Sequence, residues 1–224
     1  MRLDVKRYHK GVDIYDKNAE ELNESLLVKM LKTDFLTKLA KSDNRDDYKS
    51  NKENILLLPG IWDDDLFLCD KGCVMKGIVR NINDVQVGDK LFVLGASSFI
   101  NNLENDKIDE DTMNRDASDI INGSHTSVTL TNGSDSWKLT NESGDPEGGF
   151  DRKDLPANDY SLEPGVWRES VDGKNIKGAY SSLFCIIEPP SKGHYQLEIE
   201  NTSQLYNASP KKFELEVKYQ IEVL

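Results

Sequence analysis

Strict alternation of apolar and polar residues near the end of the chain leaves few choices for its local structure. The apolar positions are Phe213, Leu215, Val217, Tyr219, Ile221 and Val223, and the polar ones between them are Glu214, Glu216, Lys218, Gln220 and Glu222. Successive side chains of a β-strand point to opposite faces of its sheet. This period of two therefore predicts a strand with one buried face and one face in water.

Further strand patterns fill the chain from Ser124 onward. Apolar residues alternate with polar ones around Val128, Trp137 and Leu197, and the continuous apolar run 183–187 suits a buried central strand. Turn-forming residues separate these segments: Asn132 and Gly133, Gly148 and Gly149, Pro164 and Gly165, Asp172 and Gly173, Pro189 and Pro190. We predict an antiparallel β-sandwich over residues 124–224.

The first hundred residues show a helix and several short strands. Extended segments are predicted at Leu3–Tyr8 and Val12–Tyr15, and a helix at about Ala19–Ala40, with Asn18 as its N-cap and Glu21 completing a capping box. The apolar residues of this helix fall on two stripes, which indicates a helix that is wedged between other elements or broken near Thr33 and Asp34. Both interpretations are favoured over a helix lying on a membrane. Short strands are predicted at Ile55–Leu58, Leu66–Leu68, Val74–Val79 and Val85–Leu94, the last with a turn at Gly88 and Asp89.

These segments predict a mainly β fold with one N-terminal helix. Residues 1–100 form the helix and a small β-rich domain, 101–123 an acidic linker or long loop, and 124–224 the β-sandwich domain.

Charge and hydropathy exclude several classes of partner. The net charge of −12 repels nucleic acid and anionic membranes, and the closest approaches to a basic cluster are Lys6, Arg7 and Lys10, and Lys211 with Lys212. No apolar run is long enough to span a membrane. The residues after Met1 do not resemble a signal peptide, so we expect an acidic, soluble protein made in the cytoplasm. Its six glycosylation sequons are interpreted as products of an Asn- and Ser-rich composition.

Neither a cofactor nor a metal is predicted. The spacing of Cys69 and Cys73 is one residue longer than that of a zinc or redox motif, and no histidine is near. These two cysteines are either bridged or, like Cys185, free thiols. The nucleophile and phosphate-binding motifs of common enzymes are absent. We therefore predict no catalytic residues and a protein that is not an enzyme.

Aromatic residues of the second half are the candidate binding residues. Aromatic rings stack on sugars and hold choline headgroups by cation–π attraction. Trp167 and Tyr206 lie next to turn residues and are the stronger candidates for exposed binding residues, followed by Tyr180, Trp137 and Tyr195. Trp137 and Tyr195 have a second interpretation, because the alternation of their strands also places them in the core.

The order of elements from Ser124 to Leu224 resembles the actinoporin-like sandwiches, which include sea-anemone cytolysins and fungal fruit-body lectins. The similar pieces are the strand 128–132 leading to Trp137, Gly148 and Gly149, Leu155 and Pro156, Pro164 and Gly165, residues 178–180 entering 183–187, the strand 195–201, and Tyr206 with Asn207 before the last strand. The resemblance implies the sandwich shape, and a lectin-like or lipid-binding role follows from it only by analogy.

Two functions remain open from the sequence. The first is a binding module that recognises a carbohydrate, a zwitterionic lipid headgroup or a protein surface through the C-terminal sandwich. The second is a structural or assembly subunit of a particle or appendage, forming a homo-oligomer through an edge strand such as Phe213–Val223.

Overall fold

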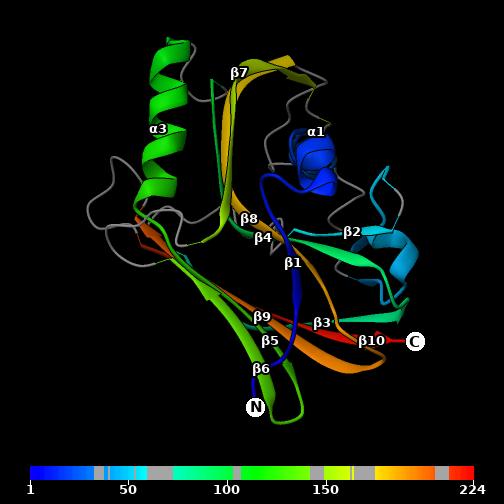
Figure 1. Cartoon of the computed structure of the whole chain (residues 1–224). Coiled ribbons are helices and arrows are strands. Elements are labelled where there is room, and N and C mark those ends of the chain that lie inside the picture. Colours follow the sequence, from blue (N-terminus) through cyan, green and yellow to red (C-terminus); the bar gives the residue numbers. More distant parts are fainter. Residues whose placement is uncertain are drawn as a thin grey trace.

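The computed structural model describes residues 1–32, 38–39, 41–52, 54–59, 73–102, 107–141, 149–161, 163, 175–204 and 212–224. Within them the chain is mostly β-strand, and two sheets pack face to face in a sandwich-like arrangement (Figure 1). The predicted strand Leu66–Leu68 lies outside the described residues.

The first sheet, here called sheet A, has the strand order β3-β10-β9-β5-β6. Its strands are β3 (Cys73–Val85), β10 (Lys212–Val223), β9 (Gly193–Gln204), β5 (His125–Asn132) and β6 (Asp135–Thr140). On β10 the side chains of Val217, Tyr219 and Ile221 are buried, while Glu216 and Lys218 on the other face reach solvent. The alternating segment is therefore a strand with one buried face, as predicted.

The second sheet, sheet B, has the order β1-β8-β4-β2, and β7 also pairs with β8. Its strands are β1 (Lys6–Tyr8), β8 (Asn175–Glu188), β4 (Lys90–Asn101), β2 (Ile55–Leu58) and β7 (Asp151–Ser161). Strands of residues 124–224 pair with one another only in antiparallel fashion among the described residues, as predicted. Both sheets are nevertheless mixed, because β3 runs parallel to β10 and β2 runs parallel to β4. In each parallel pair at least one strand comes from the first hundred residues.

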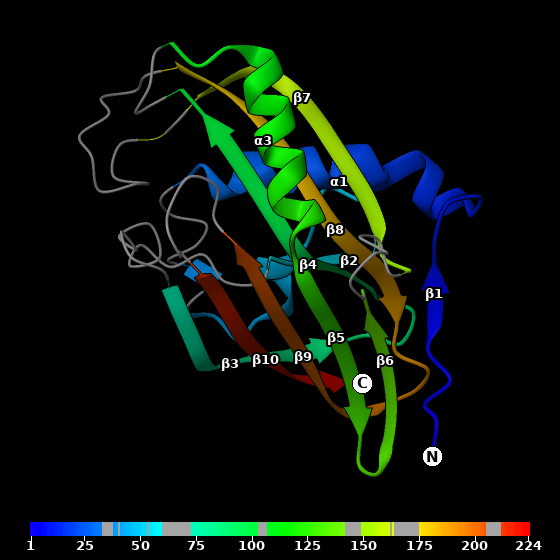
Figure 2. The same ribbon diagram turned by 90° about the vertical axis from the view of Figure 1, so that its left-hand side faces the viewer.

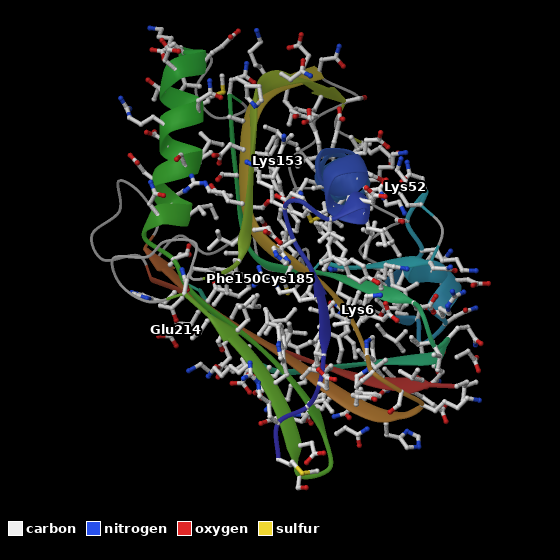
Figure 3. All side chains as sticks on the ribbon, in the orientation of Figure 1. Lys6, Lys52, Phe150, Lys153, Cys185 and Glu214 are labelled. Carbon is white, nitrogen blue, oxygen red and sulfur yellow. The ribbon has the colours of Figure 1, made fainter. Side chains whose placement is uncertain are left out.

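Strand β8 is covered on both faces, which explains its continuous apolar run. Leu183, Cys185 and Ile187 face sheet A and belong to the core between the sheets. Phe184 and Ile186 face the opposite side and belong to a second core beneath helix α1 (Asp13–Met30). Figure 3 shows Cys185 and Phe150 in the interior and Glu214 toward the outside of sheet A. The prediction of a buried central strand is confirmed.

Helix α1 begins earlier than predicted. Its first residue is Asp13, so Asn18 lies inside the helix and is not its N-cap, and the predicted extended segment Val12–Tyr15 contributes to its first turn. The reason is tertiary packing, because Val12, Ile14 and Tyr15 pack against the second core. Residues 33–37 and 40 of the predicted helix lie outside the described residues. No helix of the described residues is long and apolar enough to cross a membrane.

A second long helix occupies the segment expected to be an acidic linker or loop. Helix α3 (Glu110–Asn122) is capped by Asp109, whose carboxylate accepts a hydrogen bond of 2.7 Å from the Thr112 amide. Met113, Ala117 and Ile121 are buried at helical spacing, so the few apolar residues of this segment suffice to dock it. Figure 2 shows α3 lying along β4 and β8, with α1 crossing farther back.

Strand pairing crosses the predicted division of the chain into residues 1–100 and 124–224. Sheet A pairs β3 with β10, and sheet B pairs β1 and β4 with β8, so each sheet contains strands from both halves. The short 3-10 helix η1 (Arg45–Tyr48) is joined to the start of β4 by Arg45, which donates two hydrogen bonds of 2.5 Å to the buried Asp89.

Candidate functional site

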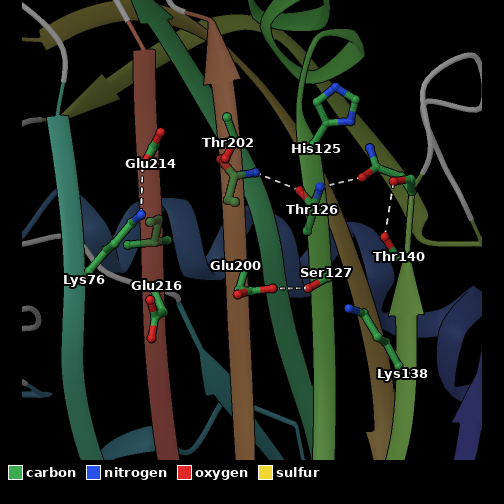
Figure 4. A pocket seen from close by; sticks show the side chains of 13 residues that line it. Lys76, His125, Thr126, Ser127, Lys138, Thr140, Glu200, Thr202, Glu214 and Glu216 are labelled. Atoms are coloured by element: carbon green, nitrogen blue, oxygen red, sulfur yellow. Dashed lines mark hydrogen bonds and ion pairs between the residues drawn. The ribbon is translucent and has the colours of Figure 1, made fainter.

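A groove of about 370 Å³ lies on the face of sheet A that is turned away from sheet B, here called the outer face (Figure 4). Its size is within the range of small-molecule sites. All five strands contribute polar side chains to it: Lys76 from β3, Glu214 and Glu216 from β10, Glu200 and Thr202 from β9, His125 and Ser127 from β5, and Lys138 and Thr140 from β6.

Strand register places these residues in rows across the sheet. Glu216 lies opposite Glu200 on the neighbouring strand, and Ser127 lies opposite Glu200 on one side and Thr140 on the other. Residues that share a row and a face have their Cβ atoms close enough to interact. The outward-facing polar residues of each alternating strand therefore form the floor of the groove.

Two ion pairs hold carboxylates at the β3 end of the groove. Lys76 Nζ lies 3.0 Å from Glu214 Oε2, and Lys218 Nζ lies 3.0 Å from Glu216 Oε1 at the groove's border. The hydrogen bond from each lysine to its glutamate raises the pKa of Lys76 and of Lys218, so both remain cations.

Glu200 and Lys138 are the charged groups best placed to meet a ligand. Glu200 Oε2 accepts a hydrogen bond of 2.9 Å from Ser127 Oγ, which orients the carboxylate. Within the described residues neither Glu200 nor Lys138 forms an ion pair, and both side chains are exposed. The site thus offers an oriented acceptor in its middle and a donor at its β6 end.

A buried hydrogen-bond network fixes the strands beneath the groove. Asn141 accepts a hydrogen bond of 2.5 Å from the Thr126 amide and donates one of 2.7 Å to the Ser124 carbonyl, and Asn201 donates one of 2.7 Å to Thr126 Oγ1. A fully satisfied buried network rigidifies the elements that it joins. It links the end of β6, β5 and β9, so the floor is held in one arrangement.

Close approach of the two sheets at this network depends on Gly95 of β4. A Cβ atom at position 95 would lie 2.7 Å from Thr126 Cγ2 and 3.1 Å from Phe150 Cε1. A side chain there would push β5 away from sheet B and disturb the network.

None of the predicted aromatic binding residues lines the groove within the described part of the chain. Trp137 and Tyr195 lie in the core between the sheets, and Tyr180 lies in the core on the α1 side of sheet B. Trp167 and Tyr206 lie outside the described residues. Sequence reasoning missed Lys138 and Glu200, although the signal was present, because they occupy the polar positions of strands whose apolar positions were recognised.

The cysteines provide no metal site in the part of the chain that the structure describes, where no group of three or more His, Cys, Asp or Glu side chains is placed to hold an ion. Burial raises the pKa of the Cys185 thiol to about 12. Cys69 and the side chain of Cys73 lie outside the described residues. Three sequon residues, Asn23, Asn141 and Asn201, are buried, so a glycan does not fit on them in the folded chain.

Comparisons with known proteins add little. No protein-family model matches the sequence, and no curated protein matches it. Among solved structures, a family 123 glycoside hydrolase from Clostridium perfringens, described in connection with glycolipid glycan hydrolysis, aligns with a TM-score of 0.24 and 16% sequence identity. The alignment covers 64% of this chain and 24% of the hydrolase. A likeness this low carries no argument about fold or function, and the resemblance to actinoporin-like sandwiches stays a prediction.

Proposed function

We propose that the chain is a non-catalytic binding protein, that the groove on the outer face of sheet A is its ligand site, and that the ligand is a carbohydrate. The observation that carries this proposal is the mixture of oriented carboxylates, ammonium groups and hydroxyl groups along one groove.

This mixture matches the hydrogen-bonding chemistry of sugars. Each sugar hydroxyl donates one hydrogen bond and accepts others, whereas a carboxylate only accepts and an ammonium only donates. A groove that presents Glu200 in its middle and Lys138 at one end therefore satisfies neighbouring hydroxyls in both directions. Hydrogen bonds to charged groups are also stronger than those between neutral groups. A ligand of a single charge sign would be attracted by either the carboxylates or the ammonium groups and repelled by the others.

The other two ligand classes expected from the sequence are less well supported. A zwitterionic choline headgroup needs an aromatic cage, and the aromatic candidates of the described residues, Trp137, Tyr180 and Tyr195, are buried. Protein interfaces depend on Trp, Tyr and Arg anchors, and the described lining of the groove contains none of these. The predicted resemblance of residues 124–224 to sandwiches that include fungal lectins implies the same class of ligand by analogy.

Assembly through a strand edge is disfavoured by the position of β10. The strand Phe213–Val223 was expected to serve as an edge, yet β10 lies between β3 and β9. Strand β3 borders sheet A instead, and Gly77 has a positive φ of 78° at a register irregularity between β3 and β10. Irregularities of this kind disrupt the regular ladder that edge-to-edge pairing needs.

The test compares Glu200→Gln with a matched control on the same face. Glu222 of β10 also points outward, opposite His194, but lies outside the groove. Wild type and both variants are applied to a glycan array, and the glycans retained are measured by titration calorimetry. We expect Glu200→Gln to lower the affinity about tenfold, because it removes a charged acceptor, and Glu222→Gln to bind as wild type does.

Two outcomes would contradict the proposal. If the array retains no protein, or if the two variants bind glycans equally well, the groove is not a sugar site. Glycans recovered after incubation are analysed by mass spectrometry, and cleavage that Glu200→Gln abolishes would show that the site is catalytic.

A further inference from the structure

We infer that the ligand is an extended oligosaccharide laid across the strands of sheet A, and not a single sugar. This inference rests on the proposed function and adds the size and orientation of the ligand. It follows from the way in which the groove is distributed over the sheet.

The groove extends over the full width of the sheet. Its lining begins at Lys76 on β3 and ends at Lys138 and Thr140 on β6, with β10, β9 and β5 between them. Neighbouring strands lie about 4.8 Å apart, so the four spacings from β3 to β6 span roughly 19 Å. One sugar ring is too short to contact both ends, whereas a short linear oligosaccharide reaches them together.

The two ends of the groove present different chemistry, which divides it into subsites. At the β3 end, Glu214 is held by Lys76 in an ion pair of 3.0 Å. At the β6 end, Lys138 stands beside the uncharged side chains of Ser127 and Thr140. Glu200 lies between these ends and is oriented by Ser127. Figure 4 shows the side chains of these three places along one face of the sheet. A ligand that contacts all three presents a different sugar unit to each of them.

The rigid floor lets each subsite bind its sugar unit without first being ordered. Continuous strand pairing joins β10 to β9 and β9 to β5, and the buried network of Asn141, Thr126 and Asn201 locks the far end. A preorganised site loses little conformational freedom when the ligand binds. Each further sugar unit that reaches a subsite therefore increases the affinity until the groove is full.

The first arm of the test is a chain-length series. Linear neutral oligomers of glucose, N-acetylglucosamine, mannose and xylose, from one to six units, are titrated into the full chain. For the oligomer that binds, we expect the affinity to rise by about tenfold or more from the monosaccharide to the longer oligomers, and then to level off.

The second arm of the test determines whether the two ends of the ligand contact the two ends of the groove. Lys138→Met and Glu214→Gln remove one charged group at each end, with Glu222→Gln as the control. Each end variant should weaken binding of the longest oligomer about tenfold and leave the disaccharide nearly unchanged. A variant that merely disturbed the fold would lower the affinity for every length by the same factor.

The results separate this inference from the proposed function. If a monosaccharide binds as tightly as the hexasaccharide and Glu200→Gln weakens both, the groove is a sugar site but the extended ligand is wrong. If no oligomer binds and an extended peptide library does, both the inference and the proposed function are overturned.

Discussion

The Tyr180 hydroxyl is buried and has no hydrogen-bond partner among the described residues. Burial raises the pKa of Tyr180 and of Tyr219 above the ordinary value of 10.0, and raises that of Cys185 from 9.0 to about 12. In the unfolded chain these groups ionise at their ordinary values. These groups therefore contribute fully to the free energy of unfolding below about pH 9. Their contribution is lost as the pH rises toward the pKa values of the folded state.

Tyr180→Phe tests this behaviour. At pH 7 we expect the free energy of unfolding to stay the same or rise slightly, because the variant removes a buried hydroxyl that lacks a partner. Between about pH 10 and 12 it should lose less stability than wild type, because one group that ionises only in the unfolded chain is gone. Urea unfolding at both pH values measures the difference. Equal losses in the two proteins would show that Tyr180 is not sheltered from solvent.

Residues 1–8, here called the N-terminal strap, join the two sheets along one side of the sandwich. The Leu3 amide donates a hydrogen bond of 2.9 Å to the Ser136 carbonyl of β6 in sheet A. A few residues later β1 pairs with β8 in sheet B, where Tyr8 Oη donates a hydrogen bond of 2.6 Å to Glu188. Leu3 is buried in the core between the sheets. The strap therefore closes an open side of the core.

Leu3→Ala should lower the free energy of unfolding by about 2–3 kcal/mol, because it leaves a cavity where the strap enters the core. Asp4→Ala is the matched control, since Asp4 is exposed next to it. Denaturant unfolding gives the free energies, and hydrogen exchange at β6 should accelerate in Leu3→Ala alone. If both variants unfold like wild type, the strap does not contribute to closing the core.

Elements with a strong local period were predictable from the sequence, and their partners were not. The alternation in β10 indicated which of its side chains face solvent, and the apolar run of β8 indicated burial on both faces. The pairing of β10 with β3 joins segments far apart in the chain, and a local period carries no information about such a partner. Helix α3 was missed because its four buried apolar residues, Met113, Ala117, Ile120 and Ile121, are interspersed with acidic ones.

At the scale of the whole molecule, the groove exists only because the topology aligns five strands from both halves of the chain. Lys76 comes from the first half and the other charged lining residues from the second, and β3 reaches them through its parallel pairing with β10. This is why the site was not predictable from the sequence, although the polar positions of each strand were. The sequence pattern favoured the aromatic residues instead, and those that the structure describes, Trp137, Tyr180 and Tyr195, fill the two cores.

Amide chemical-shift mapping locates the ligand on the folded chain. The ¹⁵N-labelled protein is titrated with the oligosaccharide that binds most tightly, and shifts are followed for every assigned amide. Changes should concentrate on the groove segments of β10, β9, β5 and β6 and of β3 near Lys76, and be absent from α1 and β2. Changes centred on α1, or on the edge of β7, with the amides around Glu200 unmoved, would show that the outer face of sheet A is not the binding surface.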